Sequence, residues 1–126
     1  MESFRALCQE NQITMQAYSP LEQGLLTGKI RMDYVLDAVN VRNKISWFQP
    51  EKRQKVLDML DGWAPLCEKY GCSTVALVIA WTMAQGMNVI CGGRKTKHIA
   101  DYIAGGDLEL SAEDLKAMAD DLEKLE

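Results

Sequence analysis

The sequence predicts an α/β protein with two parallel strands and about five helices. Two short strand-like runs, residues 13–18 and 88–93, are separated by helix-like stretches. Each run leads into a glycine-containing loop that carries basic residues. Strands separated by helices favour parallel pairing through right-handed crossovers, and ligands of such folds bind at the carboxyl ends of the strands.

A short helix and a strand are expected at the beginning of the chain. Phe4 and Leu7 fall on one helix face together with Cys8, and Asn11 is a plausible C-terminal cap. In residues 13–18 apolar and polar side chains alternate, which predicts a strand.

The loop that follows the first strand holds Leu25 and Leu26 between two glycines. Either this loop folds back on the core or it wraps a bound molecule. Residues 30–49 show no clear period and are expected to form a long loop, with a helical turn near residues 33–39. A loop of that length in a compact domain is usually functional or mobile.

A helix with a kink is expected from residue 50 onward. Pro50 suits a first helical turn, and Gly71 ends the pattern. Gly62 and Pro65 predict a kink, because proline removes a backbone hydrogen bond. The apolar stripe consists of Val56, Leu60, Trp63, Cys67 and Tyr70.

Three more helices complete the expected order. Ser73 caps a helix that is apolar nearly all round and therefore buried, and Gly86 stops it. Thr96 is the expected N-cap of the next helix, which Gly105 and Gly106 end. The last helix opens at Ser111 with a capping-box pattern in which Asp114 replaces the usual Glu. Its expected buried side consists of Leu115, Met118, Leu122 and Leu125.

Composition narrows the classes of function. The chain has 126 residues, 48% hydrophobic and 25% charged, which is ordinary for one globular domain. Its net charge of −4 disfavours nucleic-acid binding. The longest apolar run, residues 75–81, is too short to span a bilayer, so no membrane partner is expected. The N-terminus lacks the apolar core of a secretion signal, so we expect a cytoplasmic location.

The four cysteines do not predict a metal or redox site. None of them is spaced as CxxC, and the chain has one histidine, so no zinc site is expected. We interpret them as reduced thiols of the core. The residues are Cys8, Cys67, Cys72 and Cys91.

A basic cluster stands at the start of the helix that follows the second strand. It consists of Arg94, Lys95, Lys97 and His98. Cations at a helix N-terminus oppose the helix dipole, whereas a bound anion such as phosphate would reverse the sign of that interaction. The cluster is either an anion site or a solvated basic patch. His98 has no carboxylate at useful spacing, which favours a structural or ligand-contact role over a general base.

Two stretches with their spacing resemble the aldo-keto reductases. "AYSPLEQGLLTGK" is similar to that family's cofactor loop after the seventh barrel strand, and "VICGGRKTKHIADY" is similar to its eighth strand and adenosine-phosphate loop. The resemblance implies that residues 1–126 form a single partial domain, the C-terminal portion of a (β/α)₈ barrel from about its sixth helix. Two of eight strands cannot close a barrel.

The resemblance also implies binding of NADP(H). Tyr18 would stack on the nicotinamide, Lys29 would reach a phosphate, and Gly92 with Arg94 would hold the 2′-phosphate region. Leu25 and Leu26 would seat the loop on the barrel. The backbone beside the pyrophosphate would be that of Ser19, Pro20, Leu21, Glu22 and Gln23.

Three positions of the second loop depart from the family pattern. His98 stands where Gln is usual, Asp101 where Glu is common, and Tyr102 where an Asn commonly contacts adenine. All three are still expected at the cofactor.

The family's catalytic Asp, Tyr, Lys and His belong to the first half of the barrel, and nothing in this chain resembles those positions. We therefore expect no catalytic residue here, no activity of this chain alone, and a small carbonyl substrate only with the missing barrel half. Either the chain is a truncated gene product, or the segment has found another packing. A noncatalytic self-associating module and a degenerate remnant are the alternatives. Self-association is expected because open strand edges and the apolar helix after Ser73 need cover.

Overall fold

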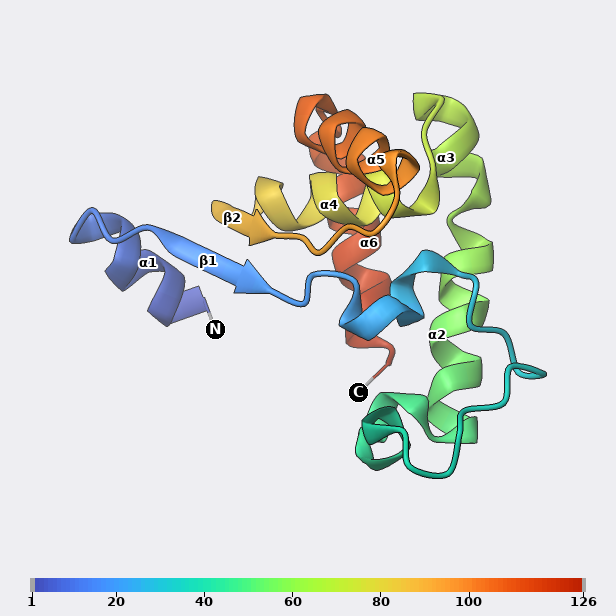
Figure 1. Ribbon diagram of the computed structural model, residues 1–126. Helices are drawn as coiled ribbons and strands as arrows, with labels where there is room; N and C mark the ends of the chain where they lie inside the picture. The colour runs from blue at the N-terminus through green and yellow to red at the C-terminus, as the bar shows by residue number, and fades with distance from the viewer. Residues whose placement is uncertain (1, 126) are drawn as a thin grey trace.

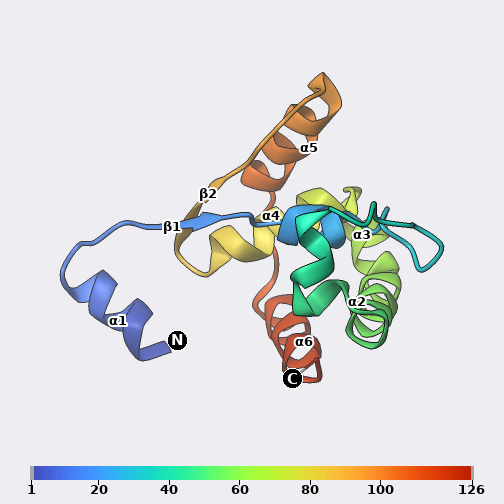
Figure 2. The same cartoon turned by 60° about the horizontal axis from the view of Figure 1, so that its bottom comes forward.

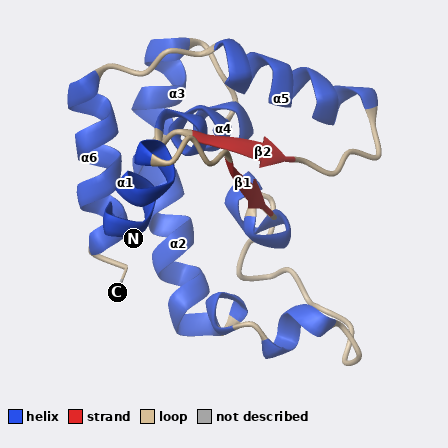
Figure 3. Ribbon diagram, turned by 90° about the vertical axis from the view of Figure 1, so that its left-hand side faces the viewer, coloured by secondary structure: helices blue, strands red, loops and turns tan. Residues whose placement is uncertain are grey.

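The computed structural model describes residues 2–125 and has the predicted α/β class. Strands β1 (Met15–Tyr18) and β2 (Met87–Ile90) pair in parallel, with Tyr18 opposite Ile90 (Figure 3). Side chains on one face of the pair are half-buried and those on the other face are exposed. The alternation predicted for residues 13–18 is therefore confirmed, although pairing begins at Met15, and β2 ends at Ile90 rather than at residue 93.

Six helices were assigned within the described residues, one more than expected. Their bounds are α1 (Glu2–Glu10), α2 (Pro50–Gly62), α3 (Ala64–Tyr70), α4 (Thr74–Ala84), α5 (Thr96–Asp107) and α6 (Ala112–Glu123). Short 3-10 turns occupy η1 (Glu22–Thr27), η2 (Val41–Lys44) and η3 (Ser46–Phe48). Helices α2, α4 and α6 form the body of the molecule, whereas α1 lies to one side, at the amino end of β1 (Figures 1 and 2).

Helix α4 forms the centre of the core, as its apolar composition predicts. Residues 75–80 are all buried. Leu25 joins the same core from η1 at 0% exposure, beside Leu77 and Met118, and Leu26 packs against its edge. The expected seating of the two leucines is confirmed. The expectation that α4 needs cover from a second copy is wrong, because α5, β2, η1 and α3 pack against it within the same chain.

The predicted kink between α2 and α3 is present. Trp63 leaves helical geometry at φ −87° and ψ 0°, and Pro65 stands in the first turn of α3. The indole N–H of the buried Trp63 donates to Asp121 Oδ2 at 3.0 Å, which fixes the junction against α6. Gly71 ends α3 in the left-handed conformation at φ 60°, as predicted.

Helix starts agree with the sequence in two of three places. The Ser73 and Ser111 hydroxyls accept from the backbone N–H groups of Ala76 and Asp114, which confirms both N-caps. The predicted cap at Thr96 is wrong by one residue, because Lys95 is the N-cap of α5 and makes no side-chain cap hydrogen bond.

Gly105 and Gly106 do not end α5, which corrects another expectation. The helix runs on to Asp107. A Cβ at Gly105 would lie 2.7 Å from the Ala76 carbonyl oxygen and 2.8 Å from Ile79 Cβ. Gly105 therefore allows α5 to pack closely against α4 and is not a C-cap.

Asn11 follows the last residue of α1, and its side-chain amide donates to the Leu7 carbonyl at 2.9 Å, which confirms it as the C-terminal cap; Gln12 then adopts φ 56°. Two further expectations at the chain's periphery need correction. The helical turns of the long loop are η2 and η3, not residues 33–39. Phe4 and Leu7 are 59% and 53% exposed, because α1 packs weakly on the remaining chain. No helix within residues 2–125 has the length and apolar composition needed to cross a bilayer.

Candidate functional site

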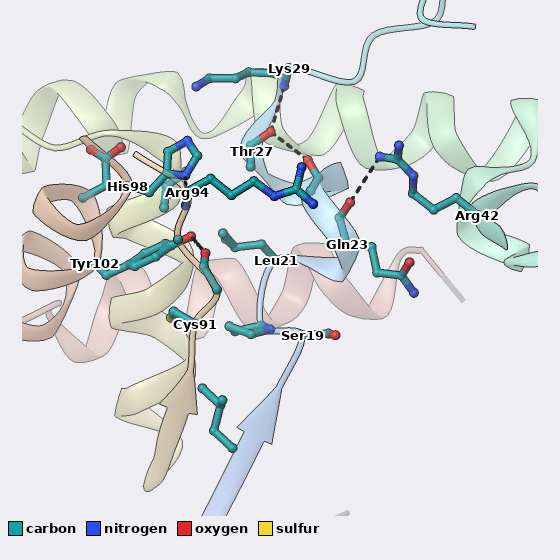
Figure 4. Close-up of a pocket in the computed structure, with 17 residues that line it drawn as sticks. Ser19, Leu21, Gln23, Thr27, Lys29, Arg42, Cys91, Arg94, His98 and Tyr102 are labelled. Atoms are coloured by element: carbon teal, nitrogen blue, oxygen red, sulfur yellow. Dashed lines mark hydrogen bonds between the residues drawn. The ribbon is translucent and has the colours of Figure 1, made fainter. Parts of the chain in front are cut away.

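A cavity of about 790 Å³ opens at the carboxyl ends of β1 and β2. Its walls are the loop from Ser19 to Lys29, the loop from Cys91 to Arg94, and the first turns of α5. These segments are far apart in the sequence, and the parallel pairing of the two strands brings them to the same edge (Figure 4). The position is the one predicted for ligands of this fold class.

The first wall has an unusual backbone. Ser19, Glu22 and Gln23 are non-glycine residues with φ of 49°, 43° and 51°, and Gly24 follows at φ 95°. Such conformations cost roughly 1–3 kcal/mol each for a residue with a side chain and cluster at functional sites. Buried Leu25 anchors the strained stretch to the core, so the wall is held in place from beneath.

The end of the first wall is closed by a small hydrogen-bond chain. Thr27 Oγ1 donates to the Gly24 carbonyl at 2.7 Å and accepts from the Lys29 backbone N–H at 3.2 Å. Gly28 adopts φ 73° between them. This geometry turns the chain so that the exposed Lys29 side chain reaches the rim of the cavity (Figure 4).

The second wall is moulded onto α5. The Tyr102 hydroxyl donates to the Gly92 carbonyl at 2.6 Å, and the Arg94 backbone N–H donates to His98 Nδ1 at 3.4 Å. A Cβ at Gly93 would lie 2.8 Å from Ile99 Cδ1, so the loop passes close to the Ile99 side chain. Burial raises the pKa of Tyr102, with smaller contributions from Cys91 and Asp101, and the phenol keeps the proton that it donates.

Three cations converge on the cavity. Arg94 and Arg42 enter it from opposite sides, and Lys29 lies at a third position on the rim (Figure 4). None of the three forms an ion pair with another residue between positions 2 and 125. The site is therefore electropositive within a chain of net charge −4.

Arg42 is a site residue that sequence reasoning missed. Its Nη1 donates to the Gln23 carbonyl at 3.5 Å, and its Nε donates to Asn40 Oδ1 at 3.1 Å. The guanidinium also lies 5.7 Å from the Phe48 ring centroid and 6.0 Å from that of Tyr34. Arg42 belongs to the loop without clear periodicity, and a cation in a long loop was the one available signal.

The structure brings together all but two of the predicted site residues. Tyr18 is 83% exposed on the open face of the strand pair, next to the cavity, and Glu22, at the start of η1, does not line the cavity. The predicted residues that line the cavity are Ser19, Pro20, Leu21, Gln23, Lys29, Gly92, Arg94, His98, Asp101 and Tyr102.

The four cysteines are free thiols, and one of them lines the cavity. Cys91 lines the cavity as a free thiol, and burial raises its pKa. Cys8 is buried, and Cys67 and Cys72 are half-buried and unpaired by disulfides. Within residues 2–125 no cluster of three or more His, Cys, Asp or Glu side chains could hold a metal ion.

Comparison with known proteins finds relatives that match nearly the whole chain. The model of the aldo/keto reductase family matches residues 1–123. The NADH-specific methylglyoxal reductase of Escherichia coli (strain K12) is 41% identical over 122 residues, which are 95% of this chain and 37% of that protein. The aldo-keto reductase str7 of Strobilurus tenacellus is 30% identical over 108 residues, covering 84% of this chain and 32% of that protein.

A solved structure has the same arrangement of elements. The glycerol dehydrogenase AKR11B4 from Gluconobacter oxydans superposes with a TM-score of 0.85 at 29% identity, over 93% of this chain and 36% of that one. The open pair of strands with its helices corresponds to part of a barrel of the TIM type. The chain spans 37% of the E. coli relative and a similar share of the others. By its sequence and by its fold, this chain belongs to the aldo/keto reductase family.

Proposed function

We propose that this segment binds the nicotinamide dinucleotide of a carbonyl-reducing oxidoreductase and prefers NADP(H). The convergence of Lys29, Arg42 and Arg94 on one cavity carries the proposal. Like charges that share a cavity repel one another, and a polyanion such as a pyrophosphate removes that repulsion. The cavity volume of about 790 Å³ is suited to a large ligand.

The proposed roles follow the two walls. The backbone from Ser19 to Gln23 runs beside the pyrophosphate, and Lys29 contacts a phosphate oxygen. Arg94 and Gly92 hold the 2′-phosphate at the adenosine end, where the uncapped N-terminus of α5 adds favourable N–H dipoles. Tyr18, exposed on the strand face, would stack on the nicotinamide.

NAD(H) is a second candidate cofactor. A relative that is 41% identical is named an NADH-specific methylglyoxal reductase. Arg94 favours NADP(H), because a guanidinium can make two parallel hydrogen bonds to a phosphate. The choice between the two depends on whether Arg94 faces the 2′-phosphate.

Titration of the chain with NADPH and with NADH at low salt tests the proposal. A hydrogen bond to a charged group contributes about 1.5–3 kcal/mol, so Arg94→Ala should weaken NADPH binding about tenfold to a hundredfold. NADH binding should hardly change. Lys95→Ala is the matched control, because Lys95 is a neighbouring cation that does not line the cavity. Equal losses for both cofactors would make the cations a generic patch, and binding of neither would refute the proposal.

We assign no catalytic residue to this segment and propose that it is inactive alone. When bound, the reduced cofactor supplies a hydride to a carbonyl carbon, and the carbonyl oxygen then needs a proton. A positioned proton donor typically contributes about 10²–10⁴-fold to the rate. Steady NADPH-dependent reduction of an aromatic aldehyde by the purified chain, lost in Tyr18→Ala, would contradict this assignment.

Self-association of the isolated chain belongs to the same proposal. Each strand has one paired edge and one open edge within the described sheet. Ile13, Tyr18 and Ile90 are exposed around these edges at 57%, 83% and 53%. Sedimentation at high micromolar concentration should show a dimer or larger species, and a strict monomer would contradict this expectation. A cytoplasmic location stays a prediction.

A further inference from the structure

The turn between α3 and α4 brings two cysteine residues together. Gly71 ends α3 in the left-handed conformation, and the chain then folds back so that the Cys72 backbone N–H donates to the Cys67 carbonyl at 3.0 Å. The Gly71 N–H donates to the Glu68 carbonyl at 3.2 Å. These two bonds form a Schellman motif, in which the side chains near the two ends of the turn commonly pack on each other. In this chain both ends of the turn carry thiols.

The backbone bond also places the two residues within reach of a disulfide. Because 3.0 Å separates the Cys72 nitrogen from the Cys67 oxygen, standard bond lengths hold the two Cα atoms within about 7 Å of each other. Cysteines whose Cα atoms lie farther apart than about 7 Å cannot be bridged without movement of the backbone. The turn therefore meets the distance requirement while the chain is folded and reduced.

The two thiols are neighbours in a half-buried position. Both side chains pack against the edge of the core, and both are free in this structure. Burial raises the pKa of Cys72 to about 11, and the adjacent Cys67 makes a further contribution. The Cys67 sulfur also lies 3.9 Å from Thr74 Oγ1. Half-burial leaves the pair accessible to a molecule as small as hydrogen peroxide.

We infer that Cys67 and Cys72 form a modification site, a dithiol that peroxide oxidises to a disulfide across the end of α3. Cys67 is the attacking thiol and Cys72 is the resolving thiol. This order follows from the pKa of Cys72, because the thiolate is the nucleophile and a thiol with a pKa of about 11 is almost fully protonated at neutral pH. In a reducing compartment the pair stays reduced and closes only when an oxidant is present.

The oxidation proceeds in two stages. The Cys67 thiolate attacks one oxygen of hydrogen peroxide and the O–O bond breaks. The departing hydroxide takes up the proton that the thiol released, which gives water and a sulfenic acid. The Cys72 sulfur then attacks the sulfenic sulfur, so that an S–S bond forms, the S–O bond breaks, and the hydroxyl leaves as water with the Cys72 proton. The two thiols lose two electrons, and the peroxide gains them.

The disulfide should stabilise the fold. It joins residues that the turn already holds together, and it removes conformations from the unfolded chain. For a loop of this length we expect the melting temperature of the oxidised chain to rise by roughly 5–10 °C. Dithiothreitol should reverse the rise, because it reduces the bond by thiol–disulfide exchange.

Peptide mapping after peroxide treatment tests the inference. Trypsin cleaves after Lys69, between the two cysteines, so the oxidised chain should yield residues 56–69 joined to residues 70–94. The second peptide also contains Cys91, so Cys91→Ser is the matched control. The link should persist in Cys91→Ser, disappear in Cys67→Ser, and open with dithiothreitol.

Trapping of the sulfenic acid with dimedone tests the order of attack. In Cys72→Ser the oxidised Cys67 has no resolving partner, so dimedone added with peroxide should label Cys67. In Cys67→Ser the labelling of Cys72 should be at least about tenfold weaker. Equal labelling of the two would overturn the assigned order.

Three results would overturn the disulfide itself. The first is oxidation of Cys91 while Cys67 and Cys72 stay free. The second is a link that forms only between two chains or only in urea. The third is a link that lowers the melting temperature, because the folded turn would then not accommodate the bond.

Discussion

The Tyr70 hydroxyl accepts a hydrogen bond from the Ser111 backbone N–H at 3.0 Å and donates one to the Asp114 carboxylate. The same carboxylate accepts from the Ser111 hydroxyl at 2.9 Å and lies 2.7 Å from Lys69 Nζ. In a standard capping box the N3 Glu accepts a hydrogen bond from the backbone N–H of the N-cap residue. Here the Tyr70 hydroxyl accepts that bond from Ser111 instead. This arrangement fastens the end of α3 to the start of α6.

Stability should fall as acid protonates Asp114. The hydrogen bonds from Lys69, Tyr70 and Ser111 lower the pKa of Asp114 to about 2. A carboxyl whose pKa is lower in the folded than in the unfolded state stabilises the fold above its unfolded pKa of about 4, and that contribution is lost as pH falls toward 2. Urea midpoints measured from pH 5 to pH 2 check this expectation.

Asp114→Asn is the variant that isolates the effect. It should lower the urea midpoint at neutral pH and flatten the acid dependence, because the group that titrates is gone. Asp107→Asn is the control, because the Asp107 carboxylate is exposed and forms no ion pair with the residues that the structure describes. An unchanged acid slope in Asp114→Asn would assign the acid sensitivity to other carboxylates.

Alanine at two adjacent glycines of α5 should act with opposite sign. The Cβ of Gly105→Ala would meet the Ala76 carbonyl oxygen at 2.7 Å, and overpacking of this kind costs roughly 1–3 kcal/mol. A Cβ at Gly106 would lie 3.9 Å from Met83 Sδ, an ordinary contact. Gly106→Ala should therefore gain up to about 1 kcal/mol of helix propensity. Urea unfolding of both variants measures the two changes in the free energy of unfolding. A similar loss of stability in both would show that the contact with α4 does not cause the destabilisation of Gly105→Ala.

Truncation of Leu25 should loosen both the core and the candidate site. The side chain is fully buried, and Leu→Ala in a core typically costs 2–5 kcal/mol, so we expect about that loss in the free energy of unfolding. Val39→Ala, at a side chain that is 93% exposed, is the control and should stay within about 0.5 kcal/mol of the unaltered chain. Amide hydrogen exchange of residues 19–28 should accelerate in Leu25→Ala. Unchanged exchange there would mean that the loop keeps its conformation without the Leu25 anchor.

Cys72 should react slowly with iodoacetamide at neutral pH. Burial raises its pKa to about 11, with smaller contributions from the neighbouring Cys67. The thiolate is the nucleophile, so alkylation should speed up about tenfold for each pH unit between roughly pH 7 and pH 9. Peptide mass spectrometry after timed labelling measures this, with Cys72→Ser to confirm the assignment. Fast labelling that does not depend on pH would place the thiol at the surface.

The sequence by itself determined most of the helices and strands and the position of the candidate site, because short-range effects decide them. Gly71 and Gly86 adopt left-handed conformations that favour glycine, and Ser73 and Ser111 satisfy the free N–H groups of the helices that they precede. These effects act within one helical turn, so they can be seen without a fold. The two glycine-containing loops were likewise visible, because parallel strands present their carboxyl ends at one edge.

Contacts between distant segments decided the rest. Glycine is common at helix ends, and so Gly105 was expected to end α5. It lies inside the helix instead, at the point where α4 approaches too closely for a Cβ atom. Arg42 enters the cavity because an aromatic platform and the Gln23 carbonyl hold a loop that has no sequence pattern. Asp101 and Tyr102 were assigned to the cofactor, and only the fold showed that Ser73 and Gly92 already engage them. Such partners are separated by 10 to 29 residues, and short-range propensity carries no information about a hydrogen bond or a steric contact at that distance.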